Sequence, residues 1–292
     1  MKKFSVMDVV IHLIVTAFSI ACLYPFLMVV SGSLSSQSAI INDGFRLFPK
    51  EITLGSYKAL LLNANTIFRA YGVTIFVTLF GTAGALFVNS SMGYVLSRKT
   101  AKYRKILNFL ILIPILFTGG MVPWYIVCVV YLDIKNTLFA LIMPMIANSW
   151  YIILIRNFFL SVPDDMHESA HIDGADEYII LFKIYYPLAK PVLATVGLFI
   201  ALAYWNDWWL GLMLVDKASI QPLQLLLYSI ISNIQFLKTM NISPEMQRLW
   251  SSVPGEGLQM AMVVITIGPM IALYPLVQKY FVKGIMVGAV KG

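Results

Sequence analysis

Six long stretches with almost no charged residues limit the fold of this chain more than any other feature. They are residues 9–30, 70–97, 106–132, 136–155, 191–215 and 257–278, and the single charge among them is Asp207. An α-helix rises about 1.5 Å per residue, so roughly 20 apolar residues cross the hydrocarbon core of a bilayer. Each stretch meets that length. The pattern predicts an all-α integral membrane protein with six transmembrane helices.

The composition excludes a soluble globular protein. Hydrophobic residues make up 59% of the chain and charged residues 12%, whereas charged residues form about 25% of an ordinary soluble domain. The formal net charge of +7 is explained by the membrane topology described next. We therefore expect membrane lipid, and no nucleic acid, among the partners.

The basic residues indicate which loops face the cytoplasm. If the N-terminus is inside, the inner segments carry Lys2 and Lys3, the cluster at 98–105 and the basic tail at 279–291. Lys and Arg concentrate on the cytoplasmic side of membrane proteins. We therefore predict a multi-pass protein with both termini in the cytoplasm.

A seventh apolar segment, residues 219–237, is interrupted by polar side chains such as Gln224, Ser232 and Asn233. Its apolar residues gather in stripes, which is typical of a helix that lies on a membrane surface. A seventh span would also place the basic tail outside. We predict an amphipathic surface helix for this segment.

The long polar segment between the fourth and fifth predicted spans, residues 156–190, is expected to contain two short helices. Ser161 is a candidate N-cap for the first, and Pro163 suits its first turn. Asp164 and Asp165 stand where the helix dipole favours negative charge. Gly174 tolerates the left-handed conformation that ends many helices, so we expect a turn there.

The second helix of this segment is expected at residues 175–186 and has an apolar stripe. The stripe consists of Tyr178, Ile179, Phe182, Tyr185 and Tyr186. An apolar face at the membrane surface implies something that covers it. Two coverings are possible: a partner protein, or the inner ends of the chain's own transmembrane helices.

Residues 167–171, HESAH, also match the His-Glu-x-x-His pattern of zinc hydrolases. In that pattern His167 and His171 would share a metal and Glu168 would activate water. A catalytic zinc site needs a third protein ligand, and the only other histidine is His12 in the first predicted span. We therefore expect no metal site and no catalytic residues, and keep a membrane-bound zinc metalloprotease as an alternative.

The same stretch matches a different pattern more fully. It contains Glu-x-Ala followed by Asp-Gly-Ala, and later a Phe and a Pro at fixed spacing; these are Glu168, Ala170, Asp173, Gly174, Ala175, Phe182 and Pro187. This run resembles the EAA loop of binding-protein-dependent ABC importer permeases. Ser169 and Tyr186 depart from that pattern. The resemblance implies that 156–190 is a coupling loop that contacts an ATPase.

The C-terminal tail, residues 279–292, is similar to that of maltose-type sugar permeases. Its last residues include Gly288, Val290, Lys291 and Gly292. In such permeases the tail reaches the ATPase interface. The resemblance covers about residues 70–292 and is strongest to the branch associated with complex oligosaccharides.

The resemblance implies a type I ABC importer permease fold in a bacterial cell membrane (inner or plasma membrane). Residues 1–69 would form a first transmembrane helix and an outer loop, and residues 70–292 a five-helix permease core. The sequence has no G-x-x-x-x-G-K-[ST] phosphate loop, so we expect no cofactor in this chain and no enzymatic activity of its own. ATP and Mg would be bound by a separate ATPase.

The expected partners follow from the same resemblance. They are a second homologous permease subunit, two ATP-binding cassette ATPase subunits, an extracytoplasmic solute-binding protein and a sugar substrate. An ATP-independent secondary transporter is a further alternative. Such proteins usually show an internal repeat or buried charges, and the sequence has no clear repeat.

Residues Trp205, Asn206, Asp207 and Trp208 are candidates for the substrate path. They lie about 20 to 27 Å into the fifth predicted span at the helical rise. Aromatic rings with nearby amide and carboxylate groups suit sugar recognition. The alternative is an aromatic belt at the membrane surface, with Asp207 reaching water.

Overall fold

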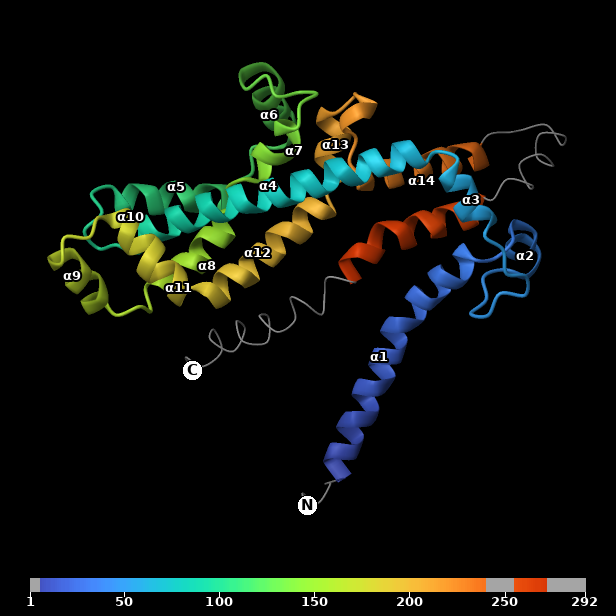
Figure 1. Cartoon of the computed structure of the whole chain (residues 1–292), viewed down its shortest axis with the longest axis horizontal. Coiled ribbons are helices and arrows are strands. Elements are labelled where there is room, and N and C mark those ends of the chain that lie inside the picture. Colours follow the sequence, from blue (N-terminus) through green and yellow to red (C-terminus); the bar gives the residue numbers. More distant parts are fainter. Residues whose placement is uncertain (1–5, 240–254, 272–292) are drawn as a thin grey trace. The chain divides into compact units, whose positions relative to one another are not determined.

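The computed structural model describes residues 6–239 and 255–271, and regular structure in these residues is helical (Figure 1). The first helices are α1 (Val6–Ser33), α2 (Gln37–Asp43), α3 (Gly55–Leu61), α4 (Ala64–Ser97), α5 (Arg104–Leu116) and α6 (Met121–Ile126), the last continued by a π-helical turn Val127–Tyr131. Then follow α7 (Phe139–Ile142) with a 3-10 turn Met143–Met145, α8 (Ser149–Phe159), α9 (Asp164–Ile172), and α10 (Glu177–Ile180) with a π-helical turn Leu181–Tyr185. The rest are α11 (Tyr186–Leu188), α12 (Lys190–Trp205), α13 (Trp209–Leu214), a 3-10 turn Ala218–Ile220, α14 (Leu223–Thr239) and the helix Gly255–Ile271. The predicted all-α class is confirmed.

The described residues form two compact units. One contains residues 6–67 together with 226–239 and 255–271, and the other contains residues 68–225. The predicted division into a first transmembrane helix with an outer loop, residues 1–69, and a five-helix core, residues 70–292, stays a prediction.

The first unit consists of the apolar helix α1 and a polar loop that packs against the helix Gly255–Ile271. Ser36 caps α2, because its Oγ accepts a hydrogen bond from the backbone N–H of Ala39 at 3.2 Å. A Cβ at Gly257 would stand 2.5 Å from the Oγ of Ser56. The glycine therefore permits a close approach between this helix and α3.

The second unit is built around α4, the longest helix of the described chain with 34 residues. A Cβ at Gly93 would lie 3.1 Å from the backbone nitrogen of Arg156, so α8 packs directly on the α4 backbone. A Cβ at Gly81 would collide with the ring of Tyr204 from α12 at 2.7 Å. Small residues at helix contacts allow this close packing in membranes.

Three predicted spans are broken rather than continuous. Residues 106–132 form α5 and the helix Met121–Tyr131, which are bent by 119°, and Gly120 between them has φ +80°. Residues 136–155 form two helices bent by 51°. The stretch 191–215 stops at Trp205 and resumes at Trp209. A run without charges reports an apolar environment, and the continuity of a helix depends on local Gly, Pro and capping groups as well.

The number of spans stays a prediction. By length and composition, two described helices can cross a membrane alone, and up to five spans result if each bent pair counts as one. The sixth predicted span, 257–278, lies partly outside the described residues. Segment 219–237 is helical in α14, as expected, and its position on a membrane surface stays a prediction.

Candidate functional site

The first helix of the 156–190 loop is α9, and it begins close to the predicted place. Asp164 and Asp165 occupy its first turn, as the sequence indicated. The predicted Ser161 cap is wrong, because the Ser161 hydroxyl donates to the carbonyl of Phe158 at 2.7 Å. Pro163 holds the N-cap position instead and provides no side-chain hydrogen bond. The helix start therefore depends on proline geometry and on the two carboxylates.

The turn after α9 is at Gly174, as predicted. Gly174 has φ +81°, in the left-handed region that favours glycine. The N–H of Ala175 donates to the carbonyl of Ala170 at 3.0 Å and closes the turn. Asp176 then caps the next helix, because its Oδ1 accepts from the N–H of Ile179 at 2.8 Å.

The second loop helix runs from Glu177 to Leu188 and includes the π-helical turn Leu181–Tyr185. Its buried face contains Ile180, Leu181 and Tyr185, whereas Tyr178, Ile179 and Phe182 of the predicted stripe are exposed. The extra residue of a π turn rotates the following side chains around the helix axis. The predicted stripe is therefore divided: part packs on the chain's own helices, and part faces outward.

The loop residues selected from the sequence also fall into two groups. Ala170 and Ala175 are half-buried and pack against the hydrophobic core. Glu168, Asp173, Gly174 and Pro187 are exposed. Phe182 is 45% exposed and stacks on Phe87 of α4 with ring centroids 6.5 Å apart. The two alanines thus fit the loop to the bundle while the acidic residues face outward.

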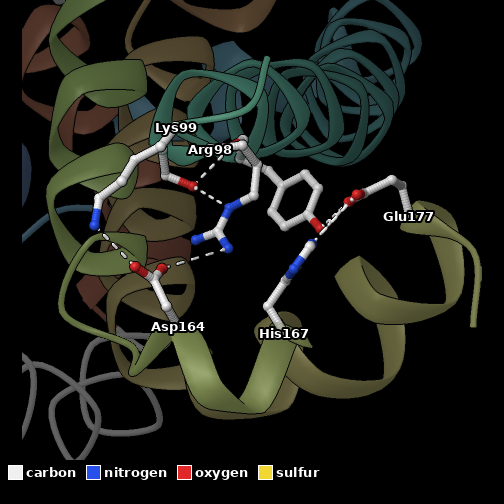
Figure 2. A network of polar contacts seen from close by, with 7 residues as sticks. Arg98, Lys99, Asp164, His167 and Glu177 are labelled. Atoms are coloured by element: carbon white, nitrogen blue, oxygen red, sulfur yellow. Dashed lines mark hydrogen bonds and ion pairs between the residues drawn. The ribbon is translucent and has the colours of Figure 1, made fainter. Parts of the chain in front are cut away.

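Figure 2 shows how α9 is attached to the residues that follow the C-terminal end of α4. Arg98 is 8% exposed, and its guanidinium lies 4.7 Å from the ring centre of Tyr185. Its Nη1 is 4.0 Å from Oδ1 of Asp164, and Nζ of Lys99 is 2.9 Å from Oδ2 of the same carboxylate. The hydrogen bond from Lys99 lowers the pKa of Asp164. Two cations thus hold the first residue of α9.

A second attachment joins α9 to the start of α10. Nε2 of His167 lies 3.2 Å from Oε1 of Glu177, and the hydroxyl of Tyr94 donates to Oε2 of Glu177. Burial by itself would raise the pKa of Glu177, but the hydrogen bonds from Tyr94 and His167 outweigh it and lower that pKa. The two loop helices and α4 therefore meet at one carboxylate.

Arg98, Lys99, Asp164, Glu177 and Tyr94 of this network were not selected as functional from the sequence, and His167 was considered only as a zinc ligand. Arg98 and Lys99 entered only as a topological signal and Asp164 only as a dipole partner. The sequence did contain one signal: the loop at 98–105 is basic and the predicted start of the first loop helix, at Asp164 and Asp165, is acidic. Opposite charges of this kind favour a contact. Arg98 and Lys99 lie more than 60 residues before Asp164, and this separation concealed the contact.

The zinc alternative is not supported. His167 is engaged with Glu177, and the rings of His167 and His171 are stacked with centroids 6.2 Å apart. Within residues 6–239 and 255–271, no three His, Cys, Asp or Glu side chains are grouped as metal ligands would be.

A groove of about 490 Å³ lies between α4 and the second loop helix. It is lined by Phe87, Ser91, Tyr94, Val95, Arg98, Thr100, Ala101, Glu177, Tyr178, Leu181 and Phe182. The groove therefore includes the outward aromatic residues of the loop and one edge of the polar network.

The predicted substrate-path residues lie at the break between α12 and α13. Trp205 is only 5% exposed, whereas Trp208 is 38% exposed. The amide of Asn206 is exposed and its Oδ1 accepts from Nε2 of Gln224 at 3.2 Å. Oδ1 of Asp207 accepts from the N–H of Leu210 at 3.4 Å and so helps start α13.

The predicted tail residues Gly288, Val290, Lys291 and Gly292 lie outside the described residues.

Comparisons with known proteins agree on one family. Residues 92–287 match the family "Binding-protein-dependent transport system inner membrane component". The chain is 38% identical to Protein LplC of Bacillus subtilis (strain 168), over 92% of this chain and 89% of that protein. It is 33% identical to the polygalacturonan/rhamnogalacturonan transport system permease protein YtcP of the same organism, over 98% of both chains.

A solved structure is also similar. It is the crystal structure of a bacterial ABC transporter involved in the import of the acidic polysaccharide alginate, with a TM-score of 0.82 and 31% identity. The likeness covers 96% of this chain and 100% of that one. This protein therefore belongs to the family of binding-protein-dependent transport system inner membrane components, the permeases of ABC importers, and has their type I permease fold.

Proposed function

We propose that this chain is the permease subunit through which an ATP-driven importer moves an oligosaccharide across the bacterial cell membrane. The observation that carries the proposal is the outward side of the coupling loop, residues 156–190. Ile172 is 84% exposed and Tyr178 is 74% exposed on either side of the Gly174 turn, next to the exposed carboxylates of Glu168 and Asp173. An apolar tip with an acidic margin suits a cleft in a partner protein.

The partner at this tip is an ATPase, of which the importer contains two. Glu168 meets a basic group of the ATPase, while Asp173, Gly174 and the outward faces of Phe182 and Pro187 complete the contact. Ala170 and Ala175 act from the inner side by seating the loop on the bundle. ATP and Mg are bound by the ATPase, and the tail residues 288–292 reach its interface.

The remaining assembly consists of a second, homologous permease and an extracytoplasmic solute-binding protein. Both termini of this chain are cytoplasmic, so that the coupling loop and the tail face the ATPases together. The basic cluster at 98–105 supports this orientation.

The substrate is an oligosaccharide, and acidic sugars are favoured by two relatives. YtcP is named for polygalacturonan and rhamnogalacturonan, and the solved transporter imports alginate. Asn206, Asp207 and Trp208 face the path, and Trp205 supports them from its buried position.

The test is reconstitution of the importer in lipid vesicles with its ATPase and binding protein. We expect ATP hydrolysis that rises when oligogalacturonate and the binding protein are both present. Glu168→Ala should reduce that stimulation severalfold, because a partly exposed ion pair contributes about 1 kcal/mol or less. Asp165→Ala is the matched control, since Asp165 is exposed in the same helix.

Two results would contradict the proposal. Sugar uptake that needs no ATP would indicate a secondary transporter. A chain that neither binds an ABC ATPase nor changes its hydrolysis would show that the coupling loop has another role.

A further inference from the structure

The chain between α7 with its 3-10 turn and α8, residues 146–148, is not helical, and we call it the break. Side chains of two other helices form hydrogen bonds with backbone groups in and before it. The amide nitrogen of Asn89 donates to the carbonyl of Ile146 at 3.0 Å, and its Oδ1 accepts from the N–H of Asn148 at 2.8 Å. Asn89 is completely buried in α4. A buried amide that bonds both sides of a break holds that break in one geometry.

Tyr204 of α12 supports the break from a second direction. Its hydroxyl donates to the carbonyl of Ile142 at 2.8 Å. The tyrosine ring packs on Gly81, where any Cβ would be closer than 3 Å to it. The residues around the break are therefore placed by α4 and α12 as well as by their own sequence.

The break, residues 146–148, lies inside the fourth predicted span, 136–155. Helix α8 has 11 residues and leads directly to the polar segment that begins α9. The polar segment 156–190 begins at Arg156 inside α8, so at about 1.5 Å per residue the N-terminal end of α8 stands about 10 Å from it, within a hydrocarbon core about 30 Å thick. An interfacial aromatic belt would lie at the surface, not at this depth.

Part of the break is exposed on the surface of the chain. Ala147 and Asn148 are exposed, and Trp150 is 67% exposed. Non-helical backbone at membrane depth is tolerated only where protein buries it or where it lines a water-filled cavity. Lipid is therefore excluded as the neighbour of the non-helical residues 146–148, and Trp150 lies beside them in the first turn of α8. This surface faces either the transport path or another subunit.

We propose that this break lines the transport path and that Trp150 is a sugar-contact residue. The proposal rests on the function proposed above, since the ligand is the oligosaccharide cargo. An indole offers an apolar face for the ring C–H groups of a sugar and an N–H donor for its hydroxyls. The exposed amide of Asn148 stands two residues away, and its Oδ1 caps α8 by accepting from the N–H of Trp150 at 2.9 Å. Asn148 therefore positions the residue that meets the sugar.

The test is chemical access to position 150 in the complete importer. Cys22 and Cys128, the cysteines of this chain, are first replaced by Ser, and Trp150→Cys is then introduced. Phe109→Cys is the matched control, because Phe109 is 66% exposed on the continuous apolar helix α5. A charged methanethiosulfonate reagent should modify Cys at 150 at least about tenfold faster than Cys at 109, since the reagent reacts from water and not from lipid.

A second measurement tests sugar contact. In the cysteine-containing wild type, Trp150→Ala should raise the sugar concentration for half-maximal uptake by about tenfold, and Trp150→Phe by less, because an aromatic face remains. Oligogalacturonate and an arabino-oligosaccharide are the two probes, and the one that the wild type takes up is used.

The outcomes are distinct. No modification at 150, with or without ATP, would overturn the inference and assign the surface to a subunit interface. Rapid modification with unchanged sugar dependence in Trp150→Ala would overturn the contact. If the wild type took up neither sugar, the proposed function would be in question while the access measurement would still decide whether position 150 lines a water path.

Discussion

At the scale of single residues, two histidines one helical turn apart differ in what they do. His167 pairs with Glu177, whereas His171 is exposed. His167→Ala should therefore loosen α9 and speed hydrogen exchange of residues 164–172 by up to about fivefold, the equivalent of about 1 kcal/mol for a partly exposed pair. His171→Ala is the matched control and should leave exchange unchanged. Stoichiometric zinc lost in both variants would instead revive the metalloprotease interpretation.

The attachment at Glu177 should also depend on pH. Its pKa is lowered below the ordinary value of 4.5 by Tyr94 and His167 despite burial. A lowered pKa means that the carboxylate stabilises the docked loop above about pH 4.5 and that this contribution is lost as the pH falls through the lower, folded value. The expected result is faster pepsin cleavage near residues 172–178 between pH 5 and pH 3.

The control for this prediction is Glu177→Gln, which removes the titrating group. Cleavage of that variant, normalised to an unfolded peptide of the same sequence, should already be fast at pH 5. Its remaining pH dependence should come from Asp164, whose pKa is also lowered, by Lys99. A variant as pH-dependent as the wild type would show that Glu177 is not the responsible carboxylate.

At the scale of elements, the angle between the two loop helices depends on Gly174. No atom lies within 4 Å of a Cβ at this position, so the cost of a substitution is the backbone conformation at φ +81°. Gly174→Val should cost about 1–2 kcal/mol or more and misplace the second helix. Gly174→Asn should be close to wild type, because Asn adopts the left-handed region readily. Co-purification of the ATPase measures both, and equal assembly of the two variants would contradict the prediction.

At the scale of the whole molecule, coupling is expected to involve the tail as well as the loop. Deletion of residues 288–292 should lower sugar-stimulated ATP hydrolysis while the helices still insert, because residues at a chain terminus contribute little to the packed bundle. Vesicle reconstitution measures the first effect and protease protection of the inserted chain the second. Full stimulation after the deletion would show that the tail does not contact the ATPase.

The amino-acid sequence by itself determined the membrane environment, the fold class and the position of the two-helix loop 156–190. The long stretches without charged residues indicate that the chain lies in a membrane, because charged side chains are costly in hydrocarbon. The Gly174 turn and the small residues around it are local requirements of backbone geometry, and such requirements can be read without any tertiary contact. The motif from Glu168 to Ala175 is likewise contiguous.

Only the tertiary structure decided how the spans break and what holds the loop. Asn89 and Ile146 are 57 residues apart, and Tyr94 and Glu177 are 83 residues apart. Such pairs leave no local pattern, because each partner alone resembles an ordinary polar residue in a helix. The sequence also placed Tyr178, Ile179, Phe182, Tyr185 and Tyr186 on one face of the second loop helix. The π-helical turn Leu181–Tyr185 rotates the later side chains, and the hydrophobic pattern of the sequence does not show where such a turn occurs. Contacts between distant segments hold the loop and the break at residues 146–148 in place, whereas the bend in 106–132 has the local mark of Gly120.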